Sequence, residues 1–341
     1  MKTKIFEINS PDDEKIKEIG EILRGGGLAA IPTETVYGLA GNALDGKSAE
    51  KIYAAKDRPS DNPLIVHISS ISEWDALVKE IPHEAQALAE AFWPGPLTVI
   101  LPKSDLIPDE VSGGLDTVAV RMPENEIARA IIKSAGVPLA APSANLSGKP
   151  SPTSASHVID DMMGRIDAIV DSGDCNVGVE STVVSLAVTP ARLLRPGKIT
   201  PEMLAEVLGE IEIDDAVFDK LAEGIEAASP GMKYKHYSPD APVALVKGSL
   251  KGFVRFLKEN ATEGTVALCF EGEEKELPVP CLTYGKKDDA SSQARHVFDA
   301  LRKVDKMGAK KVFARFPENE GMGLAVFNRL LRASAFNIIE V

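Results

Sequence analysis

Short apolar runs alternate with amphipathic stretches along most of the chain, and this alternation limits the folds that it can adopt. Residues 28–33, 64–69 and 97–102 read LAAIPT, LIVHIS and LTVILP, which is typical of short buried strands. Apolar residues at helical spacing, as in residues 16–23, separate several of these runs. Strands that alternate with helices predict an α/β fold in which helices cover a sheet. Further strands are expected at 117–123, 138–143, 167–173, 181–186 and 191–195, with helices at 48–56 and 201–208.

Two domains are predicted from the length and from a break in this alternation. A chain of 341 residues is long enough for two domains of about 150 residues each. Residues 210–241 are acidic at first and then rich in Pro, Gly and Tyr, which is typical of a linker with a function of its own. Strands and helices alternate again from Val243. We therefore expect a first domain over 1–209, a linker over 210–241 and a smaller α/β domain with a largely parallel sheet over 242–341.

The composition argues against several classes of protein. No apolar run approaches the ~18 residues of a membrane-spanning helix. The first twenty residues mix charges into every apolar stretch, so no secretion signal is predicted and a cytoplasmic location is expected. Cys175, Cys269 and Cys281 stand far apart, which argues against a disulfide framework and a thiolate zinc site, and the histidines lack metal-binding spacing. The formal net charge of -13 opposes broad binding to nucleic acid, while a local basic cleft stays open.

Polar side chains gather after several predicted strands, at the edge of a sheet where α/β proteins usually bind ligands. The run TETVYG follows the first strand, APSAN ends another with Ser143 and Asn145, and GVEST precedes a third. Taken alone, each run is better explained by a helix cap, a turn or the edge of a strand. His67, inside the apolar run LIVHIS, is by itself more typical of a buried or edge residue than of a ligand.

Four cationic residues accompany these runs. Lys56 and Arg58 end a predicted helix, where they complement the helix dipole but would also suit a phosphate group. Arg121 and Arg195 each end a predicted strand. One such arginine would be a surface residue, but two of them with Lys56 and Arg58 indicate an anionic substrate. The usual phosphate-binding loop and the nucleophile elbow are absent, so the chemistry would rely on dispersed cations and hydroxyls.

An ordered series of short motifs resembles the threonylcarbamoyl-AMP synthase family in its longer, two-domain form. The motifs are TETVYGL, KDRPSDNPLIVHI, WPGPLT, GLDTVAVRMP, APSANLSGKPSPT, GVESTVV, LLRPG and PGMKYKHYSP. They run in order over most of residues 10–240, and the C-terminal part matches mainly in position and α/β pattern. The resemblance implies a YrdC-like first domain, in which a twisted open sheet encloses a concave electropositive cleft, and a smaller Rossmann-like α/β domain after it.

The resemblance also implies roles for individual residues. The catalytic core would be Lys56, Arg58, Ser143 and Asn145. L-threonine would contact Thr35, His67, Arg121, Ala141 and Ser181, with Arg121 facing its carboxylate. ATP would be held by Arg58, Asn62, Thr117, Ser143, Ser151 and Arg195, and by Tyr234, which would reach over the nucleotide from the linker. The proline and glycine residues around Tyr234 make the linker a candidate lid.

The activity implied is the synthesis of L-threonylcarbamoyladenylate from L-threonine, bicarbonate or CO2, and ATP, with release of pyrophosphate. Mg²⁺ would come with ATP and be held mainly by phosphates and water, so no protein ligand for a metal is predicted. The product would pass to a separate transferase that modifies the adenosine next to a tRNA anticodon. Neither a membrane role nor tight binding of nucleic acid is expected.

Three other functions were weighed against this one. An RNA-binding or ribosome-maturation protein would also use a basic concave surface, but the acidic total charge and the lack of an Arg-rich or aromatic-interleaved stretch count against it. A carbamoyl-transfer enzyme with a related domain would need acylphosphatase-like and zinc-finger modules, and the required cysteine pairs are missing. A purely structural module leaves the hydroxyl and cation clusters unexplained.

Overall fold

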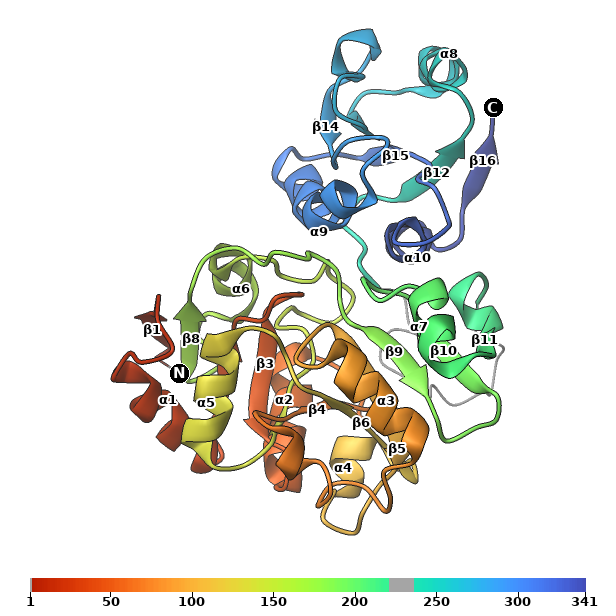
Figure 1. The fold of residues 1–341 in the computed structure, drawn as a ribbon. Helices are drawn as coiled ribbons and strands as arrows, with labels where there is room; N and C mark the ends of the chain where they lie inside the picture. Colours follow the sequence, from red (N-terminus) through yellow and green to blue (C-terminus); the bar gives the residue numbers. More distant parts are fainter. Residues whose placement is uncertain (1, 221–235) are drawn as a thin grey trace.

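The structure, a computed structural model, describes residues 2–220 and 236–341 (Figure 1). The chain forms two bodies, and each is built around its own sheet. The larger body carries the N-terminus and the smaller one carries the C-terminus. Within the described residues, no helix has both the length and the apolar character needed to cross a membrane.

The larger body contains an eleven-stranded sheet with the order β1-β8-β2-β3-β7-β4-β6-β5-β9-β10-β11. The sheet is mixed, because β4 pairs with β6 in parallel while β5 pairs with β6 antiparallel. Its strands are β1 (Lys4–Glu7), β2 (Ala29–Ile31), β3 (Gly38–Asn42), β4 (Ile65–His67), β5 (Leu97–Pro102), β6 (Thr117–Arg121), β7 (Leu139–Ala140), β8 (Ala168–Asp171), β9 (Thr182–Ser185), β10 (Ala191–Arg195) and β11 (Ile211–Ile213). Its α-helices are α1 (Lys15–Arg24), α2 (Gly46–Lys56), α3 (His83–Phe92), α4 (Asp109–Ser112), α5 (Glu126–Ala135), α6 (Ala155–Met162) and α7 (Pro201–Leu208).

Helices cover both faces of this sheet, and strand residues alternate between two cores. In β2, Ala29 and Ile31 face the apolar core that contains α1 and α5. Ala30, between them, faces the core that contains α2, α3, α6 and α7. Successive side chains of a strand point to opposite faces, so a strand that is covered on both faces is apolar throughout. This explains why the run LAAIPT carries no polar alternation.

The smaller body contains a five-stranded sheet with the order β14-β13-β15-β12-β16, in which every pair is parallel. The predicted α/β class and the largely parallel second sheet are therefore confirmed. Its strands are β12 (Val243–Lys247), β13 (Thr265–Cys269), β14 (Cys281–Thr283), β15 (Lys311–Arg315) and β16 (Ile338–Glu340). Its α-helices are α8 (Leu250–Asn260), which covers one face, and α9 (Ala290–Lys306) and α10 (Gly323–Ala333), which cover the other.

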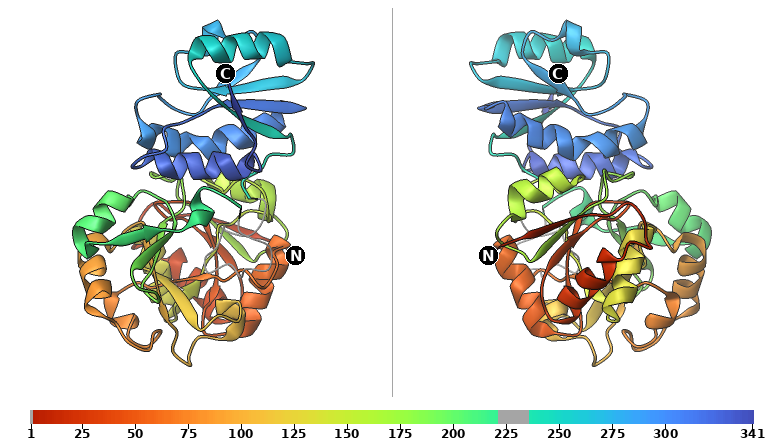
Figure 2. Two further views of the ribbon diagram at one scale, coloured as in Figure 1. Left: turned by 90° about the vertical axis from the view of Figure 1, so that its right-hand side faces the viewer. Right: turned by 90° about the vertical axis from the view of Figure 1, so that its left-hand side faces the viewer.

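The two bodies are stacked, with α9 and α10 lying against the larger one (Figure 2). Val177 and Val179 of the larger body belong to the same apolar cluster as the buried faces of these helices. Between them, Gly178 has a φ of +87°, and a Cβ there would lie 2.4 Å from the carbonyl oxygen of Ala294, so this close approach requires glycine. The first sheet also reaches slightly beyond the expected limit of residue 209, because β11 pairs with β10.

Candidate functional site

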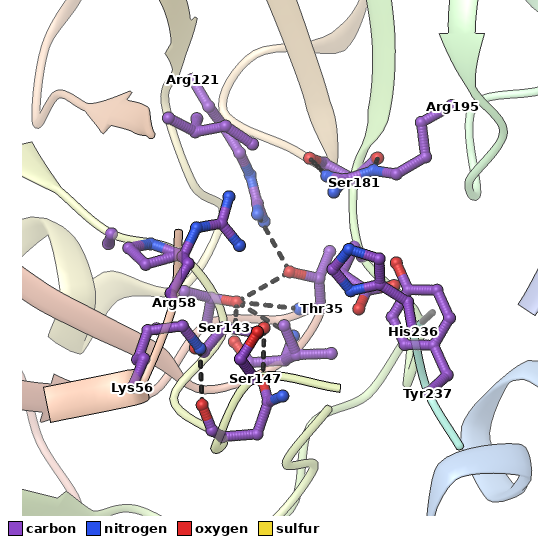
Figure 3. Close-up of a pocket in the computed structure, with 18 of the residues that line it drawn as sticks. Thr35, Lys56, Arg58, Arg121, Ser143, Ser147, Ser181, Arg195, His236 and Tyr237 are labelled. Atoms are coloured by element: carbon purple, nitrogen blue, oxygen red, sulfur yellow. Dashed lines mark hydrogen bonds between the residues drawn. The ribbon is translucent and has the colours of Figure 1, made fainter. Parts of the chain in front are cut away.

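One pocket in the larger body brings together most of the residues singled out from the sequence (Figure 3). It is lined by strand ends of the first sheet, by the end of α2 and by the last part of the predicted linker. The predicted site residues that line it are Thr35, Lys56, Arg58, His67, Arg121, Ala141, Ser143, Asn145, Ser181 and Arg195. The pocket therefore combines four cationic side chains with several hydroxyl groups.

Lys56 joins the two motifs that were expected to form the core of the site. Helix α2 ends because Asp57 takes a left-handed conformation, with a φ of 52°. The Nζ atom of Lys56 donates hydrogen bonds to the main-chain carbonyls of Ser143, at 2.5 Å, and Asn145, at 2.6 Å. Ser143 in turn donates from Oγ to Oδ1 of Asn145 at 2.5 Å. Burial, and then the nearby charge of Arg58, holds the pKa of Lys56 well below its usual value.

Arg58 makes few hydrogen bonds to the described residues. One of its terminal nitrogens donates to the main-chain carbonyls of Asn62, at 3.1 Å, and Pro63, at 3.2 Å. Its Nε atom is buried and has no hydrogen-bond partner in the described part of the chain, and the same is true of Oδ1 of Asn62. Burial lowers the pKa of Arg58 to about 10, which leaves it charged at neutral pH. Because buried polar groups are rarely unpaired, these atoms indicate a place where a ligand binds.

Arg121, at the end of β6, already has a carboxylate partner inside the protein. It donates to Oε1 of Glu34 at 2.6 Å and to Oγ1 of Thr35 at 2.9 Å. Burial raises the pKa of Glu34, but the charge of Arg121, together with hydrogen bonds from Arg121 and from the main chain, lowers it overall. The other carboxylate oxygen of Glu34 is buried and has no partner among the described residues. An anion that approaches Arg121 would therefore share it with Glu34.

His67 is neutral in this setting. Its Nδ1 atom lies 3.1 Å from the carbonyl oxygen of Ile65, and because a carbonyl only accepts, we assign the proton to Nδ1. The Nε2 atom is then an acceptor. Burial, and then the charge of Arg121, lowers the pKa of His67 to about 3. His67 can therefore accept a hydrogen bond in the pocket without adding another positive charge.

Arg195 and Ser181 form the wall opposite Lys56. Arg195 donates from Nε to the main-chain carbonyl of Ser181 at 3.0 Å and from a terminal nitrogen to its hydroxyl at 3.1 Å. Burial lowers the pKa of Arg195 to about 10. The neighbouring Glu180 also lines the pocket, and its carboxylate accepts a hydrogen bond from Ser151. The hydroxyl of Ser151 is thus occupied just behind the lining.

Among the lining residues that were not assigned a role from the sequence, three have titratable side chains: Glu180, His236 and Tyr237. All three lie in motifs that carried the family resemblance, but only Tyr234 was assigned in the linker motif, and it falls outside the described residues. The Nε2 atom of His236 is buried and has no partner among residues 2–220 and 236–341. Burial, and then the charge of Arg58, lowers the pKa of His236 to about 3. The last part of the predicted linker thus contributes polar groups to the pocket.

Three predicted ATP contacts do not line the pocket: Asn62, Thr117 and Ser151. Asn62 is buried beside Arg58, and Ser151 lies behind Glu180. Thr117 begins β6 and Arg121 ends it, which separates their backbones by about 13 Å. The role assigned to Thr117 therefore stays a prediction without support from its position. Among residues 2–220 and 236–341, no three His, Cys, Asp or Glu side chains are grouped to hold a metal ion.

The fold and the pocket define an α/β protein with a buried, anion-binding site, and comparison with known proteins places it in a family. Residues 21–197 match the family of Sua5, YciO and YrdC proteins, described as telomere recombination. Residues 199–335 match the family described as the C-terminal domain of threonylcarbamoyl-AMP synthase. The predicted YrdC-like first domain and the two-domain organisation of the family are thus confirmed.

Relatives of the same length support the assignment. The threonylcarbamoyl-AMP synthase of Pyrococcus abyssi is 46% identical over 97% of both chains, and that of Bacillus subtilis is 44% identical over 100% of both. The solved structure of Pyrococcus abyssi Sua5 complexed with L-threonine has a TM-score of 0.92 at 45% identity, over 99% of this chain and 100% of that one. The chain therefore belongs to the threonylcarbamoyl-AMP synthase family, as its motifs predicted.

Proposed function

We propose that this chain synthesises L-threonylcarbamoyladenylate from L-threonine, bicarbonate and ATP, with release of pyrophosphate. The observation that carries this proposal is the convergence of four cations and several hydroxyls on one pocket, whose described lining includes a single carboxylate, that of Glu180. All three substrates are anionic or carry an anionic group, and cationic and neutral donors are what such groups need. Membership of the family, and a relative solved with L-threonine, support the same activity.

L-threonine would occupy the side of the pocket formed by Thr35, His67, Arg121, Ala141 and Ser181. Arg121 would bind the carboxylate of the amino acid while it keeps its contact with Glu34. The neutral His67 would offer Nε2 as an acceptor to the amine or the hydroxyl of threonine. Because His67 carries no charge, it does not repel an amine that is about to react.

ATP would occupy the side formed by Lys56, Arg58, Ser143, Asn145 and Arg195, with Asn62 and Ser151 behind it. The unpartnered Nε atom of Arg58 would gain a phosphate oxygen as its acceptor. His236 and Tyr237 line the same pocket, across from Lys56 and Arg58 in Figure 3, and would cover the nucleotide. The assignment of Tyr234 to this cover remains part of the proposal.

The reaction would proceed in two steps. In the first, the neutral amine of threonine forms a bond to the carbon of CO2 and releases a proton, or forms it to the carbon of bicarbonate with net loss of water, and gives a carbamate. In the second, a carbamate oxygen attacks the α-phosphorus of ATP, and the bond from that phosphorus to the bridging oxygen breaks to release pyrophosphate. Lys56 and Arg58 would stabilise the phosphate charge, and positioning of the reactants would provide most of the rate. Mg²⁺ would accompany ATP, bound by its phosphates and by water.

The product would then pass to a separate transferase that modifies the adenosine next to a tRNA anticodon. A net charge of -13 opposes tight binding of the tRNA itself. Location in the cytoplasm, where such a transferase would act, belongs to the same proposal.

A direct assay tests the activity. The purified chain is incubated with ATP, Mg²⁺, labelled bicarbonate and L-threonine, and pyrophosphate and acid-labile label are measured together. We expect both products with L-threonine and much less of either with L-valine, which has the same shape but lacks the hydroxyl. Pyrophosphate release that is indifferent to the amino acid, or no label in the nucleotide product, would refute the proposal.

A further inference from the structure

Two buried ion pairs join the two bodies of the chain. Arg302 of α9 bonds Asp161 at 2.6 Å and donates to the main-chain carbonyl of Pro150 at 2.6 Å. Arg329 of α10 bonds Glu180 at 2.8 Å. The pairs are similar in burial and length, but they differ in one respect. Asp161 lies outside the described lining of the pocket, whereas Glu180 is part of it.

Arg329 contacts three segments that form the wall of the pocket. Its Nε atom donates to Oε2 of Glu180, and another nitrogen donates to the main-chain carbonyl of the same residue at 3.4 Å. Its third nitrogen donates to the carbonyl of Pro196 at 2.9 Å, directly after Arg195. Its guanidinium carbon also lies 5.6 Å from the centre of the Tyr237 ring. Arg329 itself is fully buried, so these contacts hold it in one place.

Arg329 stabilises the charged form of Glu180 more than any other single group does. A carboxylate that is buried beside an anion-binding pocket needs a compensating charge. Burial raises the pKa of Glu180, but the charges of Arg329 and then Arg195, with the hydrogen bonds from Ser151 and Arg329, lower it overall. Among the described residues, Lys56, His236 and Tyr237 also interact with Glu180 electrostatically.

We propose that Arg329 is a positioning residue for the nucleotide side of the pocket, through which the second body completes a site whose substrate-binding groups lie in the first. Arg329 fixes the carboxylate of Glu180, which holds the hydroxyl of Ser151, and it braces the end of β10 that carries Arg195. This inference rests on the proposed function. It gives the second body a role in catalysis although that body contributes no described residue to the lining of the pocket.

The matched pair of arginines makes the test specific. Arg329→Met is compared with Arg302→Met in the full chain, with steady-state kinetics for ATP and L-threonine from pH 5.5 to pH 8.5. We expect Arg329→Met to raise KM for ATP about tenfold with a smaller change in kcat. Arg302→Met loses an equally buried pair between the bodies, but Asp161 lies outside the described lining of the pocket, so we expect a smaller rise in KM for ATP than with Arg329→Met.

The pH profile distinguishes a role of Arg329 in positioning Glu180 from a role only in holding the two bodies together. Without Arg329, Glu180 takes up a proton at higher pH, so activity of Arg329→Met should fall on the acidic side where the unmodified chain is still active. Adding Glu180→Gln to Arg329→Met should remove that new acidic fall, because no carboxylate is left to titrate. Equal effects of Arg329→Met and Arg302→Met, or an acidic fall that persists with Glu180→Gln, would overturn the proposal.

Two further measurements keep the outcome decisive. Arg329→Lys retains the charge, and we expect it to restore the normal pH profile even if Arg329→Met folds poorly, as judged by circular dichroism and thermal melting. Failure of Arg329→Lys to do so, when it is folded, would contradict the proposal. If the unmodified chain makes no adenylate, the proposed function has failed, and calorimetric binding of ATP to the same variants still tests the role of Arg329.

Discussion

Each body of this chain has an arginine near the end of a strand or helix, Arg315 buried in the smaller body and Arg58 half-buried in the larger one, and the hydrogen-bond partners of the two differ. In the smaller body, Arg315 binds both carboxylate oxygens of Glu273, at 3.1 and 3.2 Å, and donates to the main-chain carbonyl of Gly248 at 2.7 Å. In the larger body, Arg58 has only carbonyl acceptors among the residues that the structure describes, and its Nε atom has no acceptor among them. A guanidinium that makes its hydrogen bonds within the protein stabilises the fold. One that keeps unused donors in a polar pocket can bind an anion.

The largest effect that this contrast predicts is on stability in the smaller body. Arg315→Met leaves Glu273 buried without its partner, and we expect the free energy of unfolding to fall by about 3–5 kcal/mol. Urea denaturation followed by circular dichroism measures the change. Removing both partners, in Arg315→Met with Glu273→Met, should recover part of the loss. If Arg315→Met is as stable as the unmodified chain, the structural role given to Arg315 is wrong.

The corresponding change in the larger body should act on activity instead. Arg58→Ala removes a group that few internal bonds hold, and we expect kcat/KM for ATP to fall about 100-fold or more. The free energy of unfolding should change far less than in Arg315→Met. Pyrophosphate release and urea denaturation on the same preparation separate the two effects. A variant that unfolds easily but turns over normally when folded would reverse the roles assigned to the two arginines.

A smaller effect concerns the neutral histidine of the pocket. The pKa of His67 is lowered to about 3 from its ordinary value of 6.5, so this residue is neutral in the folded chain and takes up a proton when the chain unfolds below pH 6.5. Its contribution to stability is therefore present above pH 6.5 and is lost as the pH falls toward about 3, by about 1.4 kcal/mol per pH unit. His67→Gln should reduce the slope of unfolding free energy against pH by that amount between about pH 6 and 5. An unchanged slope would show that His67 does not stay neutral.

The smallest expected effect is at Thr117, which the resemblance assigns to ATP although it does not line the pocket. Thr117→Val should change KM for ATP by no more than about twofold. Ser143→Ala, in the lining, serves as the matched control and should raise it further. A rise in KM with Thr117→Val that equals the rise with Ser143→Ala would restore the assignment and show that the nucleotide extends toward the start of β6.

Much of the fold was predictable because it depends on local patterns. The helix expected over 201–208 has those limits, since Thr200 caps it, Pro201 opens it and Gly209 follows it. Strand β3 was not predicted, because its residues GLAGN have no branched or aromatic side chain except leucine and follow a run read as a loop. Strands β11 and β16 are short and lie at sheet edges, where little apolar burial marks them.

The site was predictable only where an ordered set of motifs carried it. The proximity of Lys56 to Ser143 and Asn145 agrees with the family pattern, which no single motif could establish. The pairing of Arg121 with Glu34 spans 87 residues and that of Arg329 with Glu180 spans 149. No local periodicity of the sequence indicates such contacts, because they depend on how the sheet and the two bodies assemble. For the same reason His236 and Tyr237 were seen as part of a motif but not as part of the lining.

The hydrogen bonds of Lys56 have a consequence for how the pocket tolerates sequence change. Both acceptors of its Nζ atom are main-chain carbonyls, at positions 143 and 145. A main-chain carbonyl is supplied by every amino acid, so the location of this ammonium group is set by the path of the backbone and not by the side chains it passes. Substitutions at 143 and 145 that preserve that path can therefore alter what the pocket selects while the charge at its base stays where it is.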